Sequence, residues 1–289
     1  MKKLLLILLC LPMIGFGQDV IGYSTKSYSN NSFAQPYSNL YKTTDSGVTW
    51  TYQSSLGSYD NVSISFVSST TGYATCYQYG GTLGSSTYLL KTTDSGVTWT
   101  YQSSLASYEN VSISFVSSTT GYAICYQYGG ALGSSTNLLK TTDSGVTWTS
   151  QGSSIFKAIS YVSSTIAFAT DISDGSVFKT IDSGVTWTQQ SIPGWMDISF
   201  VSSVTGFAVT GSGSVFKTID SGVTWTFQGG SGGSDVYSIS FIKVLGCTEP
   251  FACNYNSAAT MNDSSCIFPA QQPTLACYEI ATFNTTTCV

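Results

Sequence analysis

The chain of 289 residues contains no histidine and no arginine, and all ten of its basic residues are lysines. Without histidine there is no imidazole base, no Ser-His-Asp triad and no histidine metal site. Charged residues make up only 9% of the chain and the net charge is −5. A nucleic-acid-binding protein needs a clustered basic surface. These absences exclude triad hydrolases and argue against a nucleic-acid partner.

Long apolar runs are also scarce. Residues 4–14 form an apolar stretch that is too short to span a bilayer. It follows the basic start Met1-Lys2-Lys3, and Gly15-Phe16-Gly17 then offers small residues for cleavage. We predict a secretory signal peptide over residues 1–17, no membrane span, and a secreted or cell-surface location.

One eight-residue string, Thr-x-Asp-Ser-Gly-Val-Thr-Trp, occurs five times. Its aspartates follow one another at steps of 49, 49, 39 and 38 residues, and a period of roughly 40–50 residues is typical of a four-stranded propeller blade. Asp-Ser-Gly is turn chemistry, because glycine supplies positive φ and the carboxylate accepts nearby backbone N–H bonds. The repeated aspartates and tryptophans are Asp45, Asp94, Asp143, Asp182, Asp220, Trp50, Trp99, Trp148, Trp187 and Trp225.

The repeated string resembles the Asp-box, or BNR motif, of β-propellers, which implies a structural role for its Asp and Trp. The wider spacing, Ile/Phe-Val-Ser-Ser-x-x-Gly-Tyr/Phe-Ala and then the Asp-box, resembles the photosystem II stability/assembly-factor-like branch over about residues 20–242. Sialidases are Asp-box enzymes that bind their substrate with an arginine cluster. This chain has no arginine, so it is not a sialidase of that kind.

The order of the predicted strands indicates how the ring closes. The N-terminal unit, residues 19–53, lacks the first strand of a blade, while residues 236–242 match that first strand and precede nothing blade-like. We therefore predict an all-β propeller of five four-stranded blades over residues 18–244, closed by pairing of 236–242 with the N-terminal blade. An open or larger ring, completed by residues outside this sequence, is the alternative.

The face opposite the Asp-boxes is the predicted binding surface. Strand polarity places the segments 54–61, 80–87, 103–110 and 129–136 there, as loops that are long only in the second and third units. Exposed tyrosines on them could stack on sugar rings or anchor a protein, or could simply cover their own loops. The candidate binding residues are Tyr59, Asp60, Tyr79, Tyr108, Glu109 and Tyr128.

Two of these candidates also suggest catalysis. Asp60 and Glu109 could form the carboxylate pair of a glycosidase, which needs two carboxyl groups roughly 5–10 Å apart. They occupy equivalent positions in two nearly identical units, which indicates duplication rather than division of labour. Cys76 and Cys125 are likewise equivalent on neighbouring blades, which stack about 10 Å apart, too far for a disulfide. We expect them to be buried free thiols.

Residues 245–268 change in character and resemble a Cys-rich module near the C-termini of secreted, often type IX-exported, bacterial surface proteins. Dense cysteines in an exported segment imply disulfides. We expect Cys247 to pair with Cys266, while Cys253 could pair with either or stay free. Residues 269–289 look like the start of a further repeat, so we expect a piece of a longer protein; they add the disulfide candidates Cys277 and Cys288.

The same module carries hard oxygen ligands that could hold calcium, although a disulfide knot with polar loops would explain them equally. These residues are Glu249, Asn254, Asn256, Asn262 and Asp263. No other cofactor is predicted.

Taken together, the residues favour a non-enzymatic binding or adhesion propeller that engages a glycan or a protein through its long-loop face. A glycoside hydrolase and an assembly or stability factor are the alternatives. An acidic pair across the channel without a nearby lysine would favour the hydrolase, and a large apolar patch on one face would favour the assembly factor. The sequence does not indicate an oligomeric state.

Overall fold

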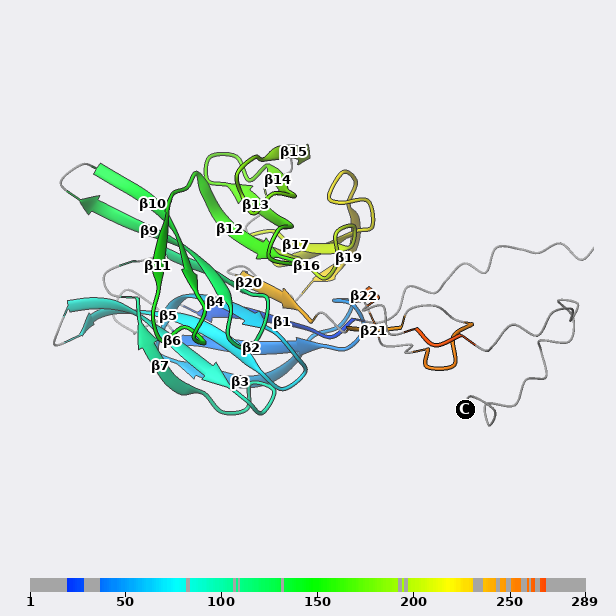
Figure 1. Cartoon of the computed structure of the whole chain (residues 1–289). Helices are drawn as coiled ribbons and strands as arrows, with labels where there is room; N and C mark the ends of the chain where they lie inside the picture. The colour runs from blue at the N-terminus through cyan, green and yellow to red at the C-terminus, as the bar shows by residue number, and fades with distance from the viewer. Residues whose placement is uncertain are drawn as a thin grey trace, which may run out of the picture.

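The computed structural model describes residues 20–28, 37–81, 84–105, 108, 110–130, 133–191, 194, 197–230, 236–242, 245–247, 251–255, 259, 261–262 and 266–268. These residues form five four-stranded antiparallel sheets and one small two-stranded sheet (Figure 1). Within these ranges there is no helix that could cross a bilayer. The predicted signal peptide and residues 269–289 lie outside the described residues.

The five sheets are blades A to E, each described from its inner to its outer strand. Blade A contains β20 (Val236–Phe241), β1 (Gly22–Tyr28), β2 (Tyr37–Thr43) and β3 (Thr51–Gly57). Blade B contains β4 (Asp60–Phe66), β5 (Gly72–Gly81), β6 (Gly84–Thr92) and β7 (Thr100–Ser104). Blade C contains β8 (Asn110–Phe115), β9 (Gly121–Gly130), β10 (Gly133–Thr141) and β11 (Thr149–Ser153).

The last two blades have shorter strands. Blade D contains β12 (Phe156–Tyr161), β13 (Ala167–Asp171), β14 (Val177–Thr180) and β15 (Thr188–Ser191). Blade E contains β16 (Asp197–Phe200), β17 (Gly206–Val209), β18 (Ser214–Thr218) and β19 (Thr226–Gly230). In the Cys-rich region the described residues include β21 (Leu245–Gly246) and β22 (Met261–Asn262), which pair in parallel.

The ring is closed by the two ends of the propeller segment, as predicted. Strand β20 pairs antiparallel with β1, from Gly22 opposite Phe241 to Lys26 opposite Val236. The inner strands contact one another in a complete circuit, β20 to β4, β8, β12, β16 and back to β20. The chain is therefore a closed five-bladed propeller, and closure gives β1 a partner on its inner edge, which would otherwise be exposed.

Aromatic stacking joins every blade to the next. In each case a ring on the second strand of one blade stacks on a ring of the next blade's inner strand, with centroids 3.5–3.7 Å apart. The pairs are Tyr23–Phe66, Tyr73–Phe115, Tyr122–Tyr161, Phe168–Phe200 and Phe207–Phe241. The last pair joins blade E to β20, so closure uses the same contact as every other interface.

Two recurring sequence features support these stacks. A Cβ at Gly72 would lie 2.7 Å from the Phe66 ring, so the glycine of Gly-Tyr/Phe-Ala leaves room for the ring. The lysine before each Asp-box extends over the second-strand ring, 5.3–5.8 Å from its centroid. These lysines are Lys42, Lys91, Lys140, Lys179 and Lys217.

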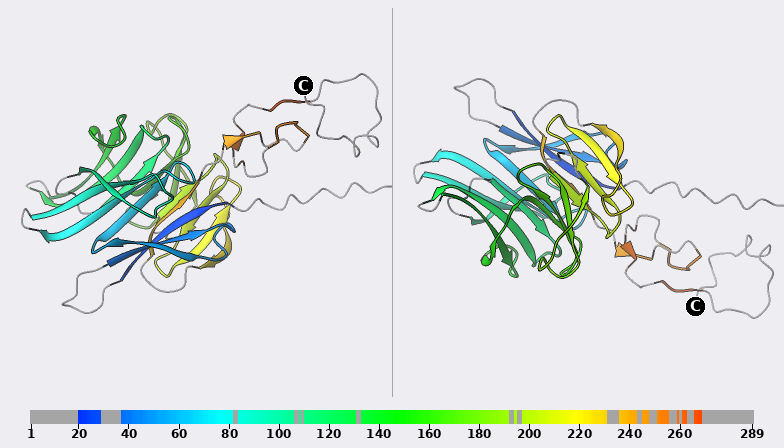
Figure 2. Two further views of the ribbon diagram at one scale, coloured as in Figure 1. Left: turned by 90° about the horizontal axis from the view of Figure 1, so that it is seen from below. Right: turned by 90° about the horizontal axis from the view of Figure 1, so that it is seen from above.

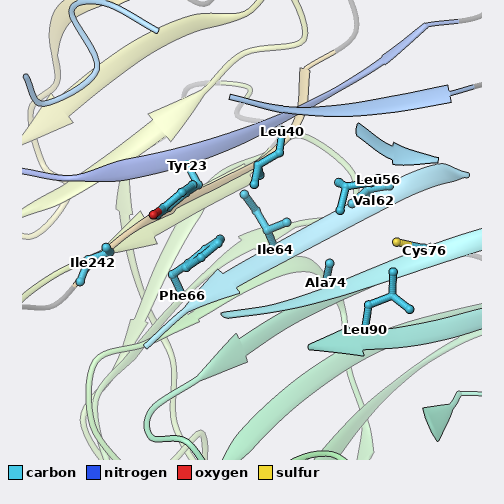
Figure 3. Packing of buried hydrophobic residues seen from close by; sticks show 10 residues of the cluster. All are labelled: Tyr23, Leu40, Leu56, Val62, Ile64, Phe66, Ala74, Cys76, Leu90 and Ile242. Atoms are coloured by element: carbon cyan, nitrogen blue, oxygen red, sulfur yellow. The ribbon is translucent and has the colours of Figure 1, made fainter. Parts of the chain in front are cut away.

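The hydrophobic core lies between blades rather than at the centre of the ring. Each interface has its own cluster of buried side chains. Figure 3 shows the cluster between blades A and B, where Leu40 and Ile64 pack beside the Tyr23–Phe66 stack. Cys76 belongs to this cluster and Cys125 to the next, and both are buried free thiols, as predicted.

The Asp-box carboxylates are occupied within their own turns. In blade B the two Asp94 oxygens accept bonds from the Thr98 amide (2.9 Å) and hydroxyl (2.5 Å) and from the Thr92 hydroxyl (2.8 Å). The Trp99 indole N–H donates to the Gly96 carbonyl at 3.2 Å. Ser95 and Gly96 have φ values of +66° and +81°, a conformation that strongly favours glycine at the second position. The same bonds recur in all five copies.

One strand boundary differs from the sequence interpretation. The sequence predicts that the fourth strand begins at the Asp-box valine, for example at Val97, but β7 begins at Thr100. Val97 is 58% exposed and its amide bonds the Asp94 carbonyl, so the valine belongs to the turn. The tryptophan, which packs on the blade's inner-strand ring, marks the end of that turn.

These carboxylates predict a loss of stability in acid. Hydrogen bonds from the box threonines lower the pKa of Asp94, Asp143, Asp182 and Asp220 to about 2. A lowered folded-state pKa stabilises the protein above the ordinary value of 3.8, and that contribution is lost as pH falls towards 2. The urea midpoint should fall over this range, and less steeply in an Asp94→Asn, Asp143→Asn double variant. A midpoint constant across the range would contradict this role.

Candidate functional site

On the face opposite the Asp-boxes, the hairpins of blades B and C extend further than those of blades D and E. Strands β5 and β6, like β9 and β10, have 10 and 9 residues. Their counterparts in blades D and E have only 4 or 5 residues. Figures 1 and 2 show both hairpins extending away from the ring on the same side. We call this surface the hairpin face.

The tips of these hairpins are two-stranded ribbons. Pairing of β5 with β4 ends at Tyr77, and pairing of β6 with β7 ends at Tyr88, yet β5 and β6 stay paired to Gly81 and Gly84. Blade C repeats this arrangement, with β9 and β10 paired as far as Gly130 and Gly133. The described residues 78–81, 84–86, 127–130 and 133–135 lie beyond the last residues of β5, β6, β9 and β10 that pair with a flanking strand. We call these segments the ribbons.

The ribbons correct the sequence interpretation of this face. The glycines of segments 80–87 and 129–136 predict loops, but most of these residues continue the strands. A register shift between Gln78 and Gly81 accommodates the glycines within the ladder. Segment 54–61 is also mostly strand, since β3 runs to Gly57 and β4 begins at Asp60.

Tyr59 and Tyr108 lie at equivalent positions where one blade passes to the next. Tyr59 is half-buried against the core between blades A and B, and its ring meets Tyr88 edge-on with centroids 6.3 Å apart. Its carbonyl accepts the Ser38 hydroxyl at 2.8 Å. Tyr108 packs likewise on the next core, and its carbonyl accepts the Thr87 hydroxyl. Burial raises the pKa of both phenols.

The other predicted binding residues are described only in part. Tyr79 and Tyr128 belong to the ribbon strands β5 and β9, and the backbone of Asp60 pairs with Tyr77. The side chains of these three residues, and Glu109 as a whole, lie outside the described residues. The structure thus places Tyr79 and Tyr128 on the ribbons and Tyr59 and Tyr108 beneath them.

A charged residue that sequence reasoning missed lies in the central channel. Asp197 begins β16 and is buried. Its Oδ2 accepts the Ser238 hydroxyl at 2.8 Å and the Ile239 amide at 2.9 Å, both from the closing strand β20. Burial raises the pKa of Asp197 to about 6 although these bonds oppose the shift. Asp197 therefore links blade E to blade A at the point of closure.

Lys157 lies near this carboxylate on the neighbouring blade D. Burial lowers its pKa, while the negative charges of Asp197, Asp171 and Asp174 oppose that shift. Asp171 accepts the Ser173 amide at 2.7 Å, and Asp174 accepts the Ser176 amide at 2.8 Å. In the part of the chain that the structure describes, Asp197 is the one buried carboxylate, and a lysine is its neighbour.

The signal that would have revealed Asp197 is present in the repeats. Inner strands of blades B, C and A place Ser63, Ser112 and Ser238 before an isoleucine, and blade D places Ala158 there. Blade E alone has an aspartate. Aligning the inner strands by the isoleucine, rather than by the Asp-box, separates Asp197 from the repeated pattern.

The C-terminal region bears out one predicted pairing. Cys247 and Cys266 form a disulfide with Cα atoms 4.7 Å apart. Cys253 is also disulfide-bonded, so the prediction that it pairs with one of these two cysteines or stays free is wrong. The amide of Ile267 donates to Asn254 Oδ1 at 2.7 Å. The other calcium candidates, Glu249, Asn256, Asp263 and the Asn262 side chain, lie outside the described residues, as do Cys277 and Cys288. No group of three or more histidine, cysteine, aspartate or glutamate side chains that could hold a metal ion occurs among the described residues.

Five four-stranded blades, closed by the two ends of the propeller segment and bearing an Asp-box turn on each blade, define the chain as a five-bladed β-propeller. No protein family and no curated protein sequence matches the chain.

Several solved structures are similar in fold. YCF48 bound to D1 peptide is 13% identical, with 58% of this chain and 82% of that chain covered and a TM-score of 0.32. A protein of unknown function from Dyadobacter fermentans is 13% identical, with 73% and 83% covered and a TM-score of 0.48. The GH93 α-L-arabinofuranosidase of Fusarium graminearum with arabinobiose is 11% identical, with 76% and 84% covered and a TM-score of 0.47. Likeness at this level carries neither a ligand nor a reaction over to this chain.

Proposed function

We propose that this chain is a secreted or cell-surface binding propeller without catalytic activity, and that it engages a protein partner through the hairpin face. The observation that carries the proposal is the pair of ribbons, which lie beyond the last residues that pair with a flanking strand. Unpaired strand edges present N–H and C=O groups in a row. An extended segment of a partner can add to such an edge as a further strand.

The composition of the ribbons suits this mode of binding. Between Gln78 and Ser86 the residues are small, polar or aromatic, with one leucine, and none is charged. Main-chain bonds would then supply most of the affinity, while Tyr79 and its equivalent Tyr128 would contact alternate side chains of the bound strand. Two parallel sites on adjacent blades would also allow a partner to engage both at once, which raises the apparent affinity.

The channel supports the non-enzymatic part of the proposal. A glycosidase needs two carboxyl groups with different protonation states. Asp197 is the one buried carboxylate of the described channel, it is held by two donors from β20, and Lys157 lies near it. The arrangement is that of an interblade link rather than of an acid and base pair.

A second candidate function rests on the opposite face. The Asp-box face of blades D and E exposes five aliphatic side chains to 46–81%: Ile181, Val185, Val204, Ile219 and Val223. In blades A to C the residues equivalent to Ile181 and Ile219 are threonines. The isoleucines make the Asp-box face of blades D and E more apolar than that of blades A to C, where the exposed aliphatic side chains of these boxes are only the equivalent valines Val48, Val97 and Val146. This favours an assembly or stability factor that binds an apolar partner surface there.

One experiment tests both candidates. A random peptide library would be selected on residues 18–289, and the enriched peptides measured on two variants. In the ribbon-exchange variant, the five residues Thr210–Ser214 of blade E replace 78–86 and 127–135, since they close an equivalent but shorter hairpin. The control variant carries Ile181→Thr and Ile219→Thr, as blades A to C do.

We expect the peptides to bind the ribbon-exchange variant at least about tenfold more weakly and the control variant unchanged. Loss in the control variant alone would support the second candidate instead. If both variants bind the peptides as tightly as the wild type, the binding site lies on neither surface. If no peptide is enriched but a glycan array binds the wild type and not the ribbon-exchange variant, the partner is a glycan.

A further inference from the structure

Serine hydroxyls accept hydrogen bonds from backbone amides of the inner strands. Each inner strand has one edge that faces the channel and pairs with no strand, which would leave its amides without acceptors. A ring of five serines supplies them, each accepting an amide of the next blade at 2.8–2.9 Å. The all-serine ring consists of Ser65, Ser114, Ser160, Ser199 and Ser240.

A second ring of amide acceptors, two residues earlier on each inner strand, is incomplete. Ser238, Ser63 and Ser112 accept the amides of the next blade's isoleucine at 3.1–3.3 Å. At the fourth position Ala158 has no hydroxyl, and at the fifth stands Asp197, which accepts the Ile239 amide at 2.9 Å. The interruption of the serine pattern therefore introduces one carboxylate into the channel.

The isoleucine carbonyls point into the same space. Ile64 donates its amide to the neighbouring blade rather than to β5, and in an antiparallel pair the carbonyl of such a residue also faces away from its partner strand. The same holds for Ile113, Ile159 and Ile239. Ile198 occupies the equivalent inner-strand position, opposite Ala208. The isoleucine side chains are buried between blades, so the groups that they turn to the channel are backbone oxygens.

These groups surround one small cavity on the channel axis. Its volume is about 20 Å³, room for a single water-sized ligand. It is lined by the five isoleucines of the inner strands, by the all-serine ring and by Asp197, and only polar atoms face it. Carbonyl, hydroxyl and carboxylate oxygens converging on one point are the ligands that hard cations prefer.

We propose that this cavity binds a single monovalent cation of the Na⁺ or K⁺ class, held by the isoleucine carbonyls and the Asp197 carboxylate. The cavity lining contains one carboxylate, which balances one positive charge, whereas a divalent ion would leave a net positive charge in a buried site. The cation would neutralise Asp197, which itself holds β20 of blade A through Ser238 and Ile239. Its role is to stabilise the closed ring where the serine pattern is broken. This inference concerns the channel and does not depend on the proposed hairpin-face function.

The test compares stability in different chlorides at one ionic strength. The urea midpoint of residues 18–289 would be measured at about pH 8 in NaCl, in KCl and in choline chloride, whose cation is too large for the cavity. For a ligand that binds only the folded state, the folding equilibrium constant rises about tenfold for each tenfold excess over the dissociation constant. We expect such a rise in Na⁺ or K⁺ over choline, and the logarithm of the folding constant should increase with the logarithm of cation concentration with a slope that approaches one, as a single site requires.

Two variants assign the effect to the channel. Asp197→Asn should abolish the cation dependence, because it removes the carboxylate while keeping an acceptor for the β20 donors. Asp174→Asn removes the same charge from an exposed position and should retain the dependence. If wild type shows the same midpoint in all three chlorides, the cavity holds water and the proposal fails. A cation dependence that persists in Asp197→Asn would also overturn it.

A second measurement does not rely on the variant folding. Crystals soaked in a thallium or rubidium salt should show one anomalous peak on the channel axis between the isoleucine carbonyls. A channel without such a peak, in crystals whose surface sites are occupied, would contradict the assignment.

Discussion

A chain that ends after residue 235 is expected to lose cooperative folding, whereas a chain that ends after Ile242 is expected to keep it. The difference between the two is β20 together with Ile242. This segment buries Ile239, Phe241 and Ile242 to within 2% of full burial. It also supplies one partner of the Phe207–Phe241 stack and the acceptors Ser238 and Ser240 for two amides of β4.

The expected size of this effect is large compared with the stability of a domain. Three fully buried apolar side chains contribute about 5–9 kcal/mol at roughly 1.5–3 kcal/mol each. A domain is stable by only about 5–15 kcal/mol. The truncation also leaves the inner edge of β1 unpaired and opens the ring between blades E and B. The shortened chain should therefore lack a single native state.

Urea unfolding and near-UV circular dichroism would compare residues 18–235 with residues 18–242. The longer chain is the matched control because it also lacks the Cys-rich region. We expect a sharp transition and a structured aromatic spectrum only from the longer chain. The same midpoint in both chains would mean that β20 does not close the ring.

Replacing Asp197 by asparagine is expected to stabilise the protein at neutral and alkaline pH and to leave it unchanged near pH 4. Burial raises the pKa of this carboxyl from its ordinary 3.8 to about 6. A raised folded-state pKa means that the stabilising contribution is present below 3.8 and is lost as pH rises through 6. The difference corresponds to about 3 kcal/mol above pH 6 in a buffer without small cations.

The measurement is the free energy of unfolding between pH 4 and pH 8 in choline chloride. The stability of Asp197→Asn minus that of wild type should grow from near zero at pH 4 to its full size above pH 6, because the pH dependence of the Asp-boxes is common to both proteins. Asp174→Asn controls for the loss of one charge near Lys157 and should follow the wild type. Parallel profiles for wild type and Asp197→Asn would show that the carboxylate is not desolvated by the ring. Na⁺ or K⁺ should reduce the wild-type slope if the channel binds a cation, so the two effects can be separated.

Ring closure could be predicted from the sequence because it depends on a repeated local pattern. The run Val236-Tyr237-Ser238-Ile239-Ser240-Phe241 repeats the Ser-Ile-Ser-Phe of β4 and β8. In the structure the serines accept amides of the next blade, the isoleucine fills an interblade core, and the phenylalanine stacks on the neighbouring ring. Such a strand, found without a blade of its own, belongs to the blade that lacks one.

The hairpin face was harder to predict because its signals are ambiguous. Gly80, Gly81 and Gly84 indicate a turn, but cross-strand pairing through a register shift keeps these residues in the ladder. Asp197 was missed for a different reason. Its chemistry depends on its register against serines that lie some 40 residues away on the neighbouring blade, as its bond to Ser238 shows. The repeat string that organises the sequence does not include this position.

Hydrogen exchange, with and without a peptide selected on the wild-type protein, tests the binding proposal most directly. The peptide should slow exchange of the ribbon amides in 78–81, 84–86, 127–130 and 133–135, which lie beyond the flanking strands in the free chain. The Asp-box turns of blades D and E should exchange at the same rate in both states. Protection confined to those turns, around Ile181 and Ile219, or protection spread evenly over all five blades, would contradict binding at the hairpin face.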